Sequence, residues 1–411
     1  MAFQATQADR YDAIVVGSGA TGGWAAKKLT ESGMRVALLE AGGNVTKKDY
    51  TEHTQPWQLP YLGMSPKVFK DRPIQGKCYA CSEYNYKWFV NDNENPYTQD
   101  KPFNWIRMRV LGGRSLSWGR QSYRMGDIDF KAASKDGYGE NWPIEYSDLV
   151  KYYEEVEKYV GISGMAEGLD QLPDSIFQPA MDFTCTEAHL RTQAKAKMGR
   201  VVTMGRVAIL TKPLNGRQAC HYCGPCERGC VTTSYFSSPF TTVADAMKTG
   251  RMTLLTNAAA ARVIMQDGGK ADGVEYIDTT TRELKKVRAK VIVLCASTLE
   301  STRLLMNSNI CNSSGALGKY LMDHIYQFAA NPGHLGFEHA RHHQRRHQAV
   351  RCQCAFHSNR SGHQVCRAGC SEDASPCQEV VRSGFKSRSS ESNNSRARSS
   401  LARLFYGSPV C

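Results

Sequence analysis

The sequence predicts the α/β fold class. Two domains are expected, in an α+β arrangement, followed by a disordered tail. It has 411 residues, 41% of them hydrophobic, which is enough for more than one core of the usual domain size of about 100–200 residues. A strand–turn–helix–strand pattern lies near the start, and apolar runs return between residues 289 and 309. After Gly333 the composition changes abruptly, and this change predicts the tail.

The first ordered segment is YDAIVVGSGATGGWAAKKLTESGMRVALLEAGG, residues 11–43. Apolar runs at 13–16 and 36–39 predict two strands, and Trp24, Ala25 and Leu29 are spaced as on one helix face. The segment therefore predicts a β-α-β unit with a glycine turn after its first strand.

The turn reads GxGxxG, a Rossmann-like dinucleotide fingerprint. Its first glycine permits the turn, the second lets the backbone approach a pyrophosphate at the helix N-terminus, and the third permits close packing of helix on strand. An acidic residue at the end of the second strand can accept hydrogen bonds from ribose hydroxyls and would repel a 2′-phosphate. The predicted binding residues are Gly17, Ser18, Gly19, Ala20, Thr21, Gly22, Glu40 and Ala41.

A second glycine segment, KPFNWIRMRVLGGRSLSWGRQSYRM, covers residues 101–125. It resembles the second flavin-contacting segment of the glucose–methanol–choline (GMC) oxidoreductases, where a double glycine and small hydroxyl residues lie against the isoalloxazine and the pyrophosphate. The resemblance favours FAD over NAD. It places Gly112, Gly113, Ser115, Ser117 and Trp118 at the cofactor.

The resemblance continues through residues 141–164, 237–264 and 289–309, so that it covers about residues 10–330. It implies that Ala260 holds the adenine through backbone groups, and that Ala296 and Ser297 follow a strand beside the cofactor. It also implies a Rossmann-like FAD-binding domain at 10–165 and 241–333, interrupted by a substrate or partner segment at 166–240. The substrate domain is expected to be incomplete.

One position departs from the family in a way that bears on the flavin link. Some pyranose oxidase-like members carry, before the tryptophan, a histidine that is bonded covalently to the flavin; here that position is Ser117. Serine cannot form this bond, so we expect non-covalent FAD. Arg114 stands where relatives often have a small residue, and it either brings a cation to the cofactor or points to solvent.

The stretch ACHYCGPCERGC has four cysteines spaced C-x2-C-x2-C-x3-C: Cys220, Cys223, Cys226 and Cys230. This spacing is that of bacterial ferredoxins, and related dehydrogenases that reduce a cytochrome carry such a segment. We expect a 3Fe-4S or 4Fe-4S cluster here; structural zinc and ordinary or disulfide-linked cysteines are the alternatives. Cys78 and Cys81 form a second CxxC, for which ordinary cysteines or a local disulfide are favoured.

The family resemblance implies hydride transfer from the CH–OH group of a sugar, polyol or sugar acid to FAD. A cytochrome or quinone-type acceptor, with a small subunit and a cytochrome c as partners, is expected. In the family a C-terminal histidine accepts the hydroxyl proton. No such ending is recognisable here, so the catalytic residues stay unknown and the chain as written is expected to be inactive. His324 is better explained as a structural or flavin-neighbouring residue.

Residues 334–411 hold twelve Lys and Arg against five Asp and Glu, with seven of the eleven His and six of the fifteen Cys. We interpret this segment as disordered and as the product of a frameshift that replaces the family's ending. A zinc module among its Cys and His residues and a nucleic-acid-binding arm at 382–400 are the alternatives. The whole chain carries a net charge of +13, more than half of it in this segment, so nucleic acid is not expected as a partner.

Targeting signals are also missing from the sequence as written. It has no run of about 18 apolar residues, so no membrane span is expected, and its first residues lack the pattern of an export signal. This predicts a cytoplasmic protein, or a periplasmic one if a partner subunit carries the signal.

Overall fold

The computed structural model describes residues 10–59 and 66–321. Its centre is a six-stranded sheet in the order β5-β2-β1-β8-β7-β6. The strands are β1 (Arg10–Val16), β2 (Val36–Leu39), β5 (Met252–Leu255), β6 (Ala258–Met265), β7 (Ala271–Asp278) and β8 (Leu284–Leu294). The first four strands in the order are parallel, whereas β7 is antiparallel to both of its neighbours. This mixed sheet confirms the predicted α/β fold class.

The predicted β-α-β unit forms the middle of this sheet. Helix α1 (Ala20–Glu31) connects β1 to β2, which lie in parallel register with Ile14 opposite Ala37. On the other side β8 pairs with β1, with Ile14 opposite Ile292. Strands from the beginning and the end of the described chain therefore meet in one sheet, as the return segment predicts.

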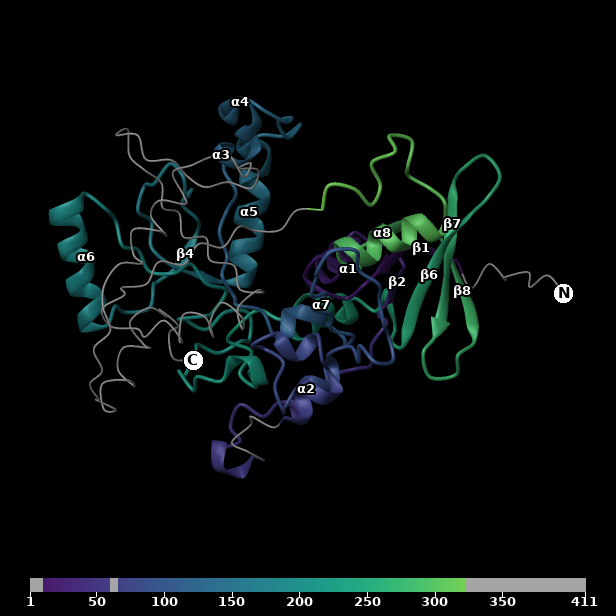
Figure 1. The fold of residues 1–411 in the computed structure, drawn as a ribbon, viewed down its shortest axis with the longest axis horizontal. Helices are drawn as coiled ribbons and strands as arrows, with labels where there is room; N and C mark the ends of the chain where they lie inside the picture. The colour runs from purple at the N-terminus through teal and green to yellow at the C-terminus, as the bar shows by residue number, and fades with distance from the viewer. Residues whose placement is uncertain (1–9, 60–65, 322–411) are drawn as a thin grey trace.

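The two faces of the sheet are covered by different elements because successive strand residues point to opposite sides. Ala13 and Val15 pack with α1 and with α7 (Thr242–Lys248) in one buried cluster. Ile14 and Val16 pack with β6, β7 and Leu304 of α8 (Thr298–Asn307) in another. Figure 1 shows these helices beside the sheet.

A second group of elements lies at the other end of the molecule, opposite β6–β8 (Figure 1). It contains α3 (Asp127–Phe130), α4 (Ala132–Asp136), α5 (Tyr146–Val160), α6 (Cys185–Met198) and the short parallel pair β3 (Ile162–Ser163) and β4 (Phe177–Gln178). Helix α5 lies within the segment compared above with the family's helix at 141–164. The domain boundaries proposed from the sequence stay predictions.

Long connections between these groups contain α2 (Lys67–Asp71) and several short 3-10 helices. The latter are η2 (Lys47–Asp49), η3 (Pro56–Gln58), η5 (Gln75–Lys77), η6 (Tyr86–Trp88), η7 (Gly113–Leu116), η8 (Cys226–Arg228) and η9 (Ser238–Phe240). The interpretations placed on His324 and on residues 334–411 lie outside the described residues.

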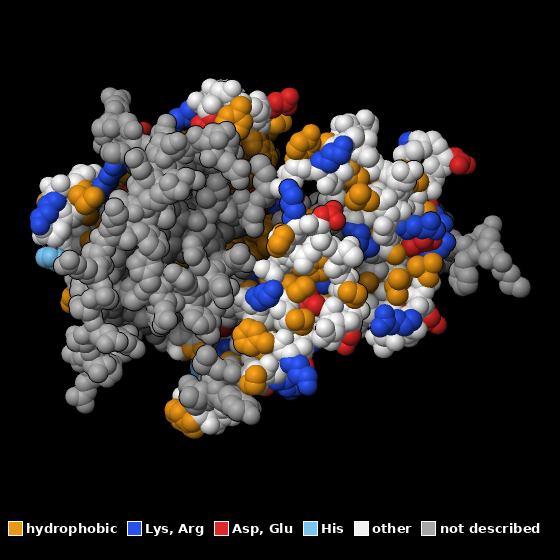
Figure 2. Space-filling model, viewed as in Figure 1, with side chains coloured by type: hydrophobic (Ala, Val, Ile, Leu, Met, Phe, Trp, Pro, Cys, Tyr) orange, Lys and Arg blue, Asp and Glu red, His pale blue; other side chains and the backbone are white. Residues whose placement is uncertain are grey.

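Charged side chains of both signs are interspersed at the β7–β8 end of the face drawn in Figure 2. Lys285 pairs with Asp278 at 2.8 Å and Lys286 with Glu275 at 2.9 Å. Arg10 pairs with Asp272 at 3.0 Å. The lysines and arginines named here are thus balanced by acids.

Candidate cofactor-binding site

A cavity of about 650 Å³ lies where the glycine loop leaves β1. Its wall combines segments that are far apart in the sequence. They are the loop 16–21, the end of β2 at 39–41, residues 105–109, residues 113–115 with Trp118, Gly119 and Gln121, residues 258–260 of β6, residues 295–297, Tyr79 and, from α8, Glu300, Arg303 and Leu304. Both glycine segments singled out in the sequence therefore face one space.

The glycine loop has the backbone geometry that its spacing predicts. Gly17 has φ +97°, and a Cβ there would lie 2.5 Å from the Cys295 carbonyl oxygen. A Cβ on Gly22 would lie 1.8 Å from the Gly17 carbonyl oxygen, so helix α1 can approach the loop only without a side chain there. A Cβ on Gly19 would meet nothing within 4 Å. Because Gly19 lines the cavity, its missing side chain leaves room for a ligand.

The first turn of α1 begins directly after this loop, with Gly19 as its N-cap residue. Backbone N–H groups in a first helical turn have no intrahelical acceptor, and together with the helix dipole they favour an anion. The open space at Gly19 and the helix start at Ala20 therefore fit the pyrophosphate of a dinucleotide.

Glu40 connects the end of β2 to the glycine loop. Its carboxylate accepts hydrogen bonds from Ser18 N at 3.2 Å, Ser18 Oγ at 2.5 Å and Gly42 N at 2.8 Å. Burial raises the pKa of this carboxyl group, and the hydrogen bonds from Ser18 and Gly42 oppose that shift. Glu40 also lines the cavity, where its position fits the predicted role toward ribose hydroxyls.

A network of hydroxyl groups joins the two glycine segments. Gly112 N donates to Ser18 Oγ at 2.8 Å, and Ser115 Oγ donates to the Gly112 carbonyl at 2.7 Å. Ser238 N donates to Ser115 Oγ at 3.0 Å, while Ser238 Oγ donates to the Ser18 carbonyl at 2.7 Å. Ser238, which sequence reasoning missed, thus fixes the first glycine segment against the second.

Most of the predicted cofactor residues line the cavity. Those that do are Gly17, Ser18, Gly19, Ala20, Thr21, Glu40, Ala41, Gly113, Ser115, Trp118, Ala260, Ala296 and Ser297. The other three, Gly22, Gly112 and Ser117, lie behind the wall. Gly22 and Gly112 permit close packing, since a Cβ on Gly112 would lie 2.3 Å from Pro239. Ser117 is buried, and its Oγ lies 2.9 Å from the Met108 sulfur.

The wall also contains charged residues that the sequence analysis did not identify. Arg303 donates to the Ala260 carbonyl at 3.1 Å, and Arg109 lies 3.7 Å from Glu300. The only local signal was the proximity of residues 105–109 to the double glycine; Arg303 and Glu300 carry no motif. Arg114 lies in the wall as well, which favours the first of its two interpretations, a cation beside the cofactor.

The cysteine-rich loop does not form a metal centre in this structure. Cys223 and Cys230 carry free thiols and are of intermediate exposure. Cys226 is buried, and Cys220 and Cys230 pack against the same apolar cluster. Across residues 10–59 and 66–321, no three His, Cys, Asp or Glu side chains are grouped so as to hold a metal ion. The geometry therefore gives the expected iron–sulfur cluster no support.

Tyr235, which packs with Cys226 in this apolar cluster, connects it to the segment next to the cavity wall. Tyr235 donates to the Leu116 carbonyl at 2.8 Å, and Arg120 lies 5.4 Å from the Tyr235 ring centroid. The loop also meets the second CxxC segment, since Asn85 Nδ2 donates to the Glu227 carbonyl at 3.0 Å. Cys78 and Cys81 are both buried and free, which agrees with ordinary cysteines rather than a local disulfide.

Among the described residues, no helix combines the length and the apolar character needed to cross a membrane.

Comparison with known proteins identifies one family. The family model described as GMC oxidoreductase matches residues 11–326. The 2-methyl-1,2-propanediol dehydrogenase of Mycolicibacterium austroafricanum is 29% identical over 342 residues, which cover 79% of this chain and 57% of the relative. The fructose dehydrogenase large subunit of Gluconobacter japonicus is 24% identical over 335 residues, covering 76% and 58%. The chain thus spans a little over half the length of these relatives.

A solved structure titled pyridoxine 4-oxidase, from Mesorbium loti, has a TM-score of 0.40 and 19% identity. The match covers 73% of this chain and 52% of the other.

Proposed function

Since this chain belongs to the GMC oxidoreductase family, whose members act on CH–OH groups, we propose that its cavity binds FAD without a covalent link and serves the oxidation of a sugar or polyol. The observation that carries the proposal is that residues of two glycine segments, about 90 positions apart, line one cavity with an open space at Gly19. When bound, FAD supplies the hydride acceptor.

Each part of the wall has its own proposed contact with the cofactor. The loop at 17–21 and the start of α1 bind the pyrophosphate through backbone N–H groups. Glu40 accepts hydrogen bonds from the ribose, and backbone groups of Ala260 hold the adenine. Gly113, Ser115 and Trp118 lie along the isoalloxazine, and Ser117 behind them offers no imidazole for a covalent link.

The finer substrate assignment rests on the names of the relatives. One relative is named for a diol and another for fructose, which supports a sugar, polyol or related alcohol as substrate. The second is named a large subunit, which supports assembly with a partner subunit. We further propose a cytochrome or quinone-type acceptor, which is what the resemblance seen in the sequence implies.

Anaerobic titration of the flavin-loaded chain tests this function. Fructose, glucose and short diols are added in turn while the flavin absorbance near 450 nm is recorded, with L-amino acids as a control substrate class. Bleaching by a sugar or diol alone supports the proposal. A chain that never carries flavin but binds NAD would contradict it.

Two expectations from the sequence can be measured in the same preparation. Iron and acid-labile sulfide, measured per flavin, test the cluster at the four cysteines. Reoxidation of the reduced flavin by a quinone analogue, by cytochrome c and by dioxygen, followed separately, tests the acceptor. Inactivity of the chain as written also stays a prediction. Bleaching of the flavin by a sugar or diol would contradict that inactivity while supporting the proposed reaction.

A further inference from the structure

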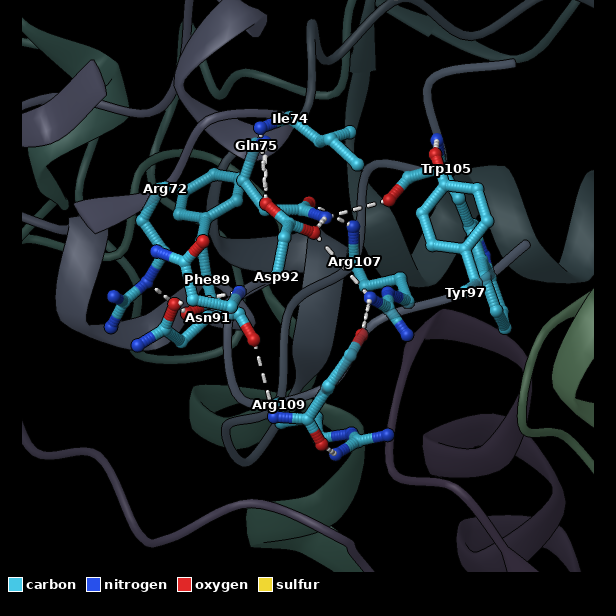
Figure 3. A network of polar contacts seen from close by, with 12 residues as sticks. Arg72, Ile74, Gln75, Phe89, Asn91, Asp92, Tyr97, Trp105, Arg107 and Arg109 are labelled. Carbon is cyan, nitrogen blue, oxygen red and sulfur yellow. Dashed lines mark hydrogen bonds and ion pairs between the residues drawn. The ribbon is translucent and has the colours of Figure 1, made fainter. Parts of the chain in front are cut away.

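Gln75, at the start of η5, is fully buried beside the cavity wall but does not line the cavity itself. Its side chain lies at the centre of the polar network in Figure 3. The network connects two segments that are separated by about 30 residues. A buried amide must satisfy its hydrogen-bonding groups within the protein, so its partners indicate what it holds in place.

The Gln75 amide binds the backbone on both sides of Ile106. Nε2 donates to the Trp105 carbonyl at 2.7 Å, and Oε1 accepts a hydrogen bond from Arg107 N. This pair of bonds reproduces what a neighbouring β-strand would supply. Trp105, Ile106 and Arg107 all line the cavity, so the amide fixes a stretch of its wall.

Asp92 sets the orientation of this amide. Its Oδ1 accepts from Gln75 Nε2 at 2.8 Å, and its Oδ2 accepts from the backbone N–H groups of Ile74 and Gln75 at 3.1 and 3.2 Å. A flipped amide would direct its oxygen at both the Asp92 carboxylate and the Trp105 carbonyl. Only the observed orientation satisfies all the partners.

The wall segment has a strand-like partner at its C-terminal end. Val90 N donates to the Arg107 carbonyl at 3.1 Å, and Arg109 N donates to the Trp88 carbonyl at 2.9 Å. These bonds form a single bridge, between Phe89 and Met108, outside the six-stranded sheet. The Gln75 amide therefore holds the wall where this short pairing ends.

Arg107 extends the network to the cavity itself. Its guanidinium lies 3.4 Å from Asp92 Oδ1, donates to the Asn95 carbonyl at 2.9 Å and lies 4.4 Å from the Trp105 ring centroid. Its Nε is buried and has no hydrogen-bond partner within the described part of the chain. The wall thus presents a cation whose position depends on Gln75 and Asp92.

We propose that Gln75, oriented by Asp92, is a positioning residue that shapes the 105–107 wall to receive FAD. The inference rests on the proposed function, because it takes FAD as the ligand of the cavity. Gln75 acts through the backbone of the wall and does not touch the cofactor. Its loss should alter how tightly, and in what geometry, the flavin is held.

The test compares Gln75→Ala with Gln178→Ala in the full chain. Gln178 is a matched control, since its Oε1 binds the backbone N–H groups of Thr211 and Lys212 at 2.9 and 3.0 Å, away from the cavity. FAD affinity is measured by titration of the apoprotein, the bound geometry by visible circular dichroism of the flavin, and the apoprotein Tm by thermal unfolding.

We expect Q75A to weaken FAD binding at least tenfold and to change the circular dichroism of the bound flavin. Q178A should keep wild-type FAD affinity and flavin dichroism, even if it lowers the Tm of the apoprotein. Affinity and dichroism of Q75A equal to those of the wild type, or an equal loss in Q178A, would overturn the inference.

If Q75A does not fold, Asp92→Asn is the deciding variant. It keeps the shape of the side chain but places an amide, in place of the carboxylate, against Gln75 and Arg107. We expect FAD binding to weaken at least threefold, and unchanged binding would overturn the inference. A wild-type chain that binds no FAD overturns the proposed function instead.

Discussion

The glycine loop and the cysteine-rich loop are both dense, regular motifs, yet they differ in what their spacing determines. A glycine acts through its own backbone, so Gly17 and Gly22 fulfil their roles by leaving room for the Cys295 and the Gly17 carbonyl, respectively. Four metal-ligating cysteines act only if their side chains converge. In the structure the glycine loop has the expected form, whereas no three Cys, His, Asp or Glu side chains of the described residues are grouped to hold a metal ion, and Cys226 is buried in an apolar cluster. A motif that works through the backbone is thus more securely interpreted than one that requires side chains to meet.

The largest effect should come from Gly22→Ala. The new Cβ would lie 1.8 Å from the Gly17 carbonyl oxygen, so the helix and the loop must separate. We expect a loss of about 3 kcal/mol or more in the free energy of unfolding, with loss of FAD binding. Urea denaturation measures it. Gly205→Ala serves as the control, because Gly205 has no positive φ and its Cβ would come no closer than 4.0 Å to another residue, at Tyr123 Oη. A fully stable G22A variant would contradict the role given to Gly22.

Gly19→Ala should separate binding from folding. The added Cβ meets no protein atom within 4 Å, and Gly19 has a φ of −62°, so the apoprotein should be as stable as wild type. The methyl group would occupy the space proposed for the pyrophosphate and remove a close backbone contact. We expect FAD affinity to fall by about tenfold or more, the equivalent of one lost charge-assisted hydrogen bond. Equal affinity of G19A and wild type would place the ligand elsewhere.

Cys226→Ala tests the other side of the comparison. Cys226 is buried with Met181, Val207, Ile209 and Tyr235, so removing its sulfur should cost about 1 kcal/mol of unfolding free energy through lost packing. FAD affinity should not change. Bound iron in the wild type that disappears in C226A would contradict this packing role and support the cluster prediction.

The smallest effect should come from Glu275, which lies far from both loops in β7. Its hydrogen bonds with Arg262 and then Lys286 lower its pKa to about 2. Because the folded-state pKa lies below the ordinary value near 4.5, the stabilisation is full above that pH and is lost as the pH falls toward 2. Glu275→Gln should cost about 1 kcal/mol at pH 7 and flatten the acid limb of a stability–pH profile. FAD binding serves as the internal control, and an unaltered acid limb would contradict the assignment.

The sequence predicted the parts of the site that depend on local patterns. Apolar runs and the glycine spacing placed β1, α1, β2 and Glu40, and the double glycine located the second cofactor segment, part of which forms η7. Ser238, Arg303 and Gln75 could not be found in this way, because each functions through a partner more than 25 residues away. Their residue types are common, and only the folded chain brings Ser238 to Ser18 or Gln75 to Arg107.

Titration of the wild-type apoprotein with FAD, followed by calorimetry, tests the central claim most directly. If the two glycine segments form one cofactor cavity, FAD should bind with one-to-one stoichiometry, ADP should compete with it, and flavin should be released on denaturation. Absence of saturable FAD binding by a folded chain, or FAD binding that ADP does not affect, would contradict the account.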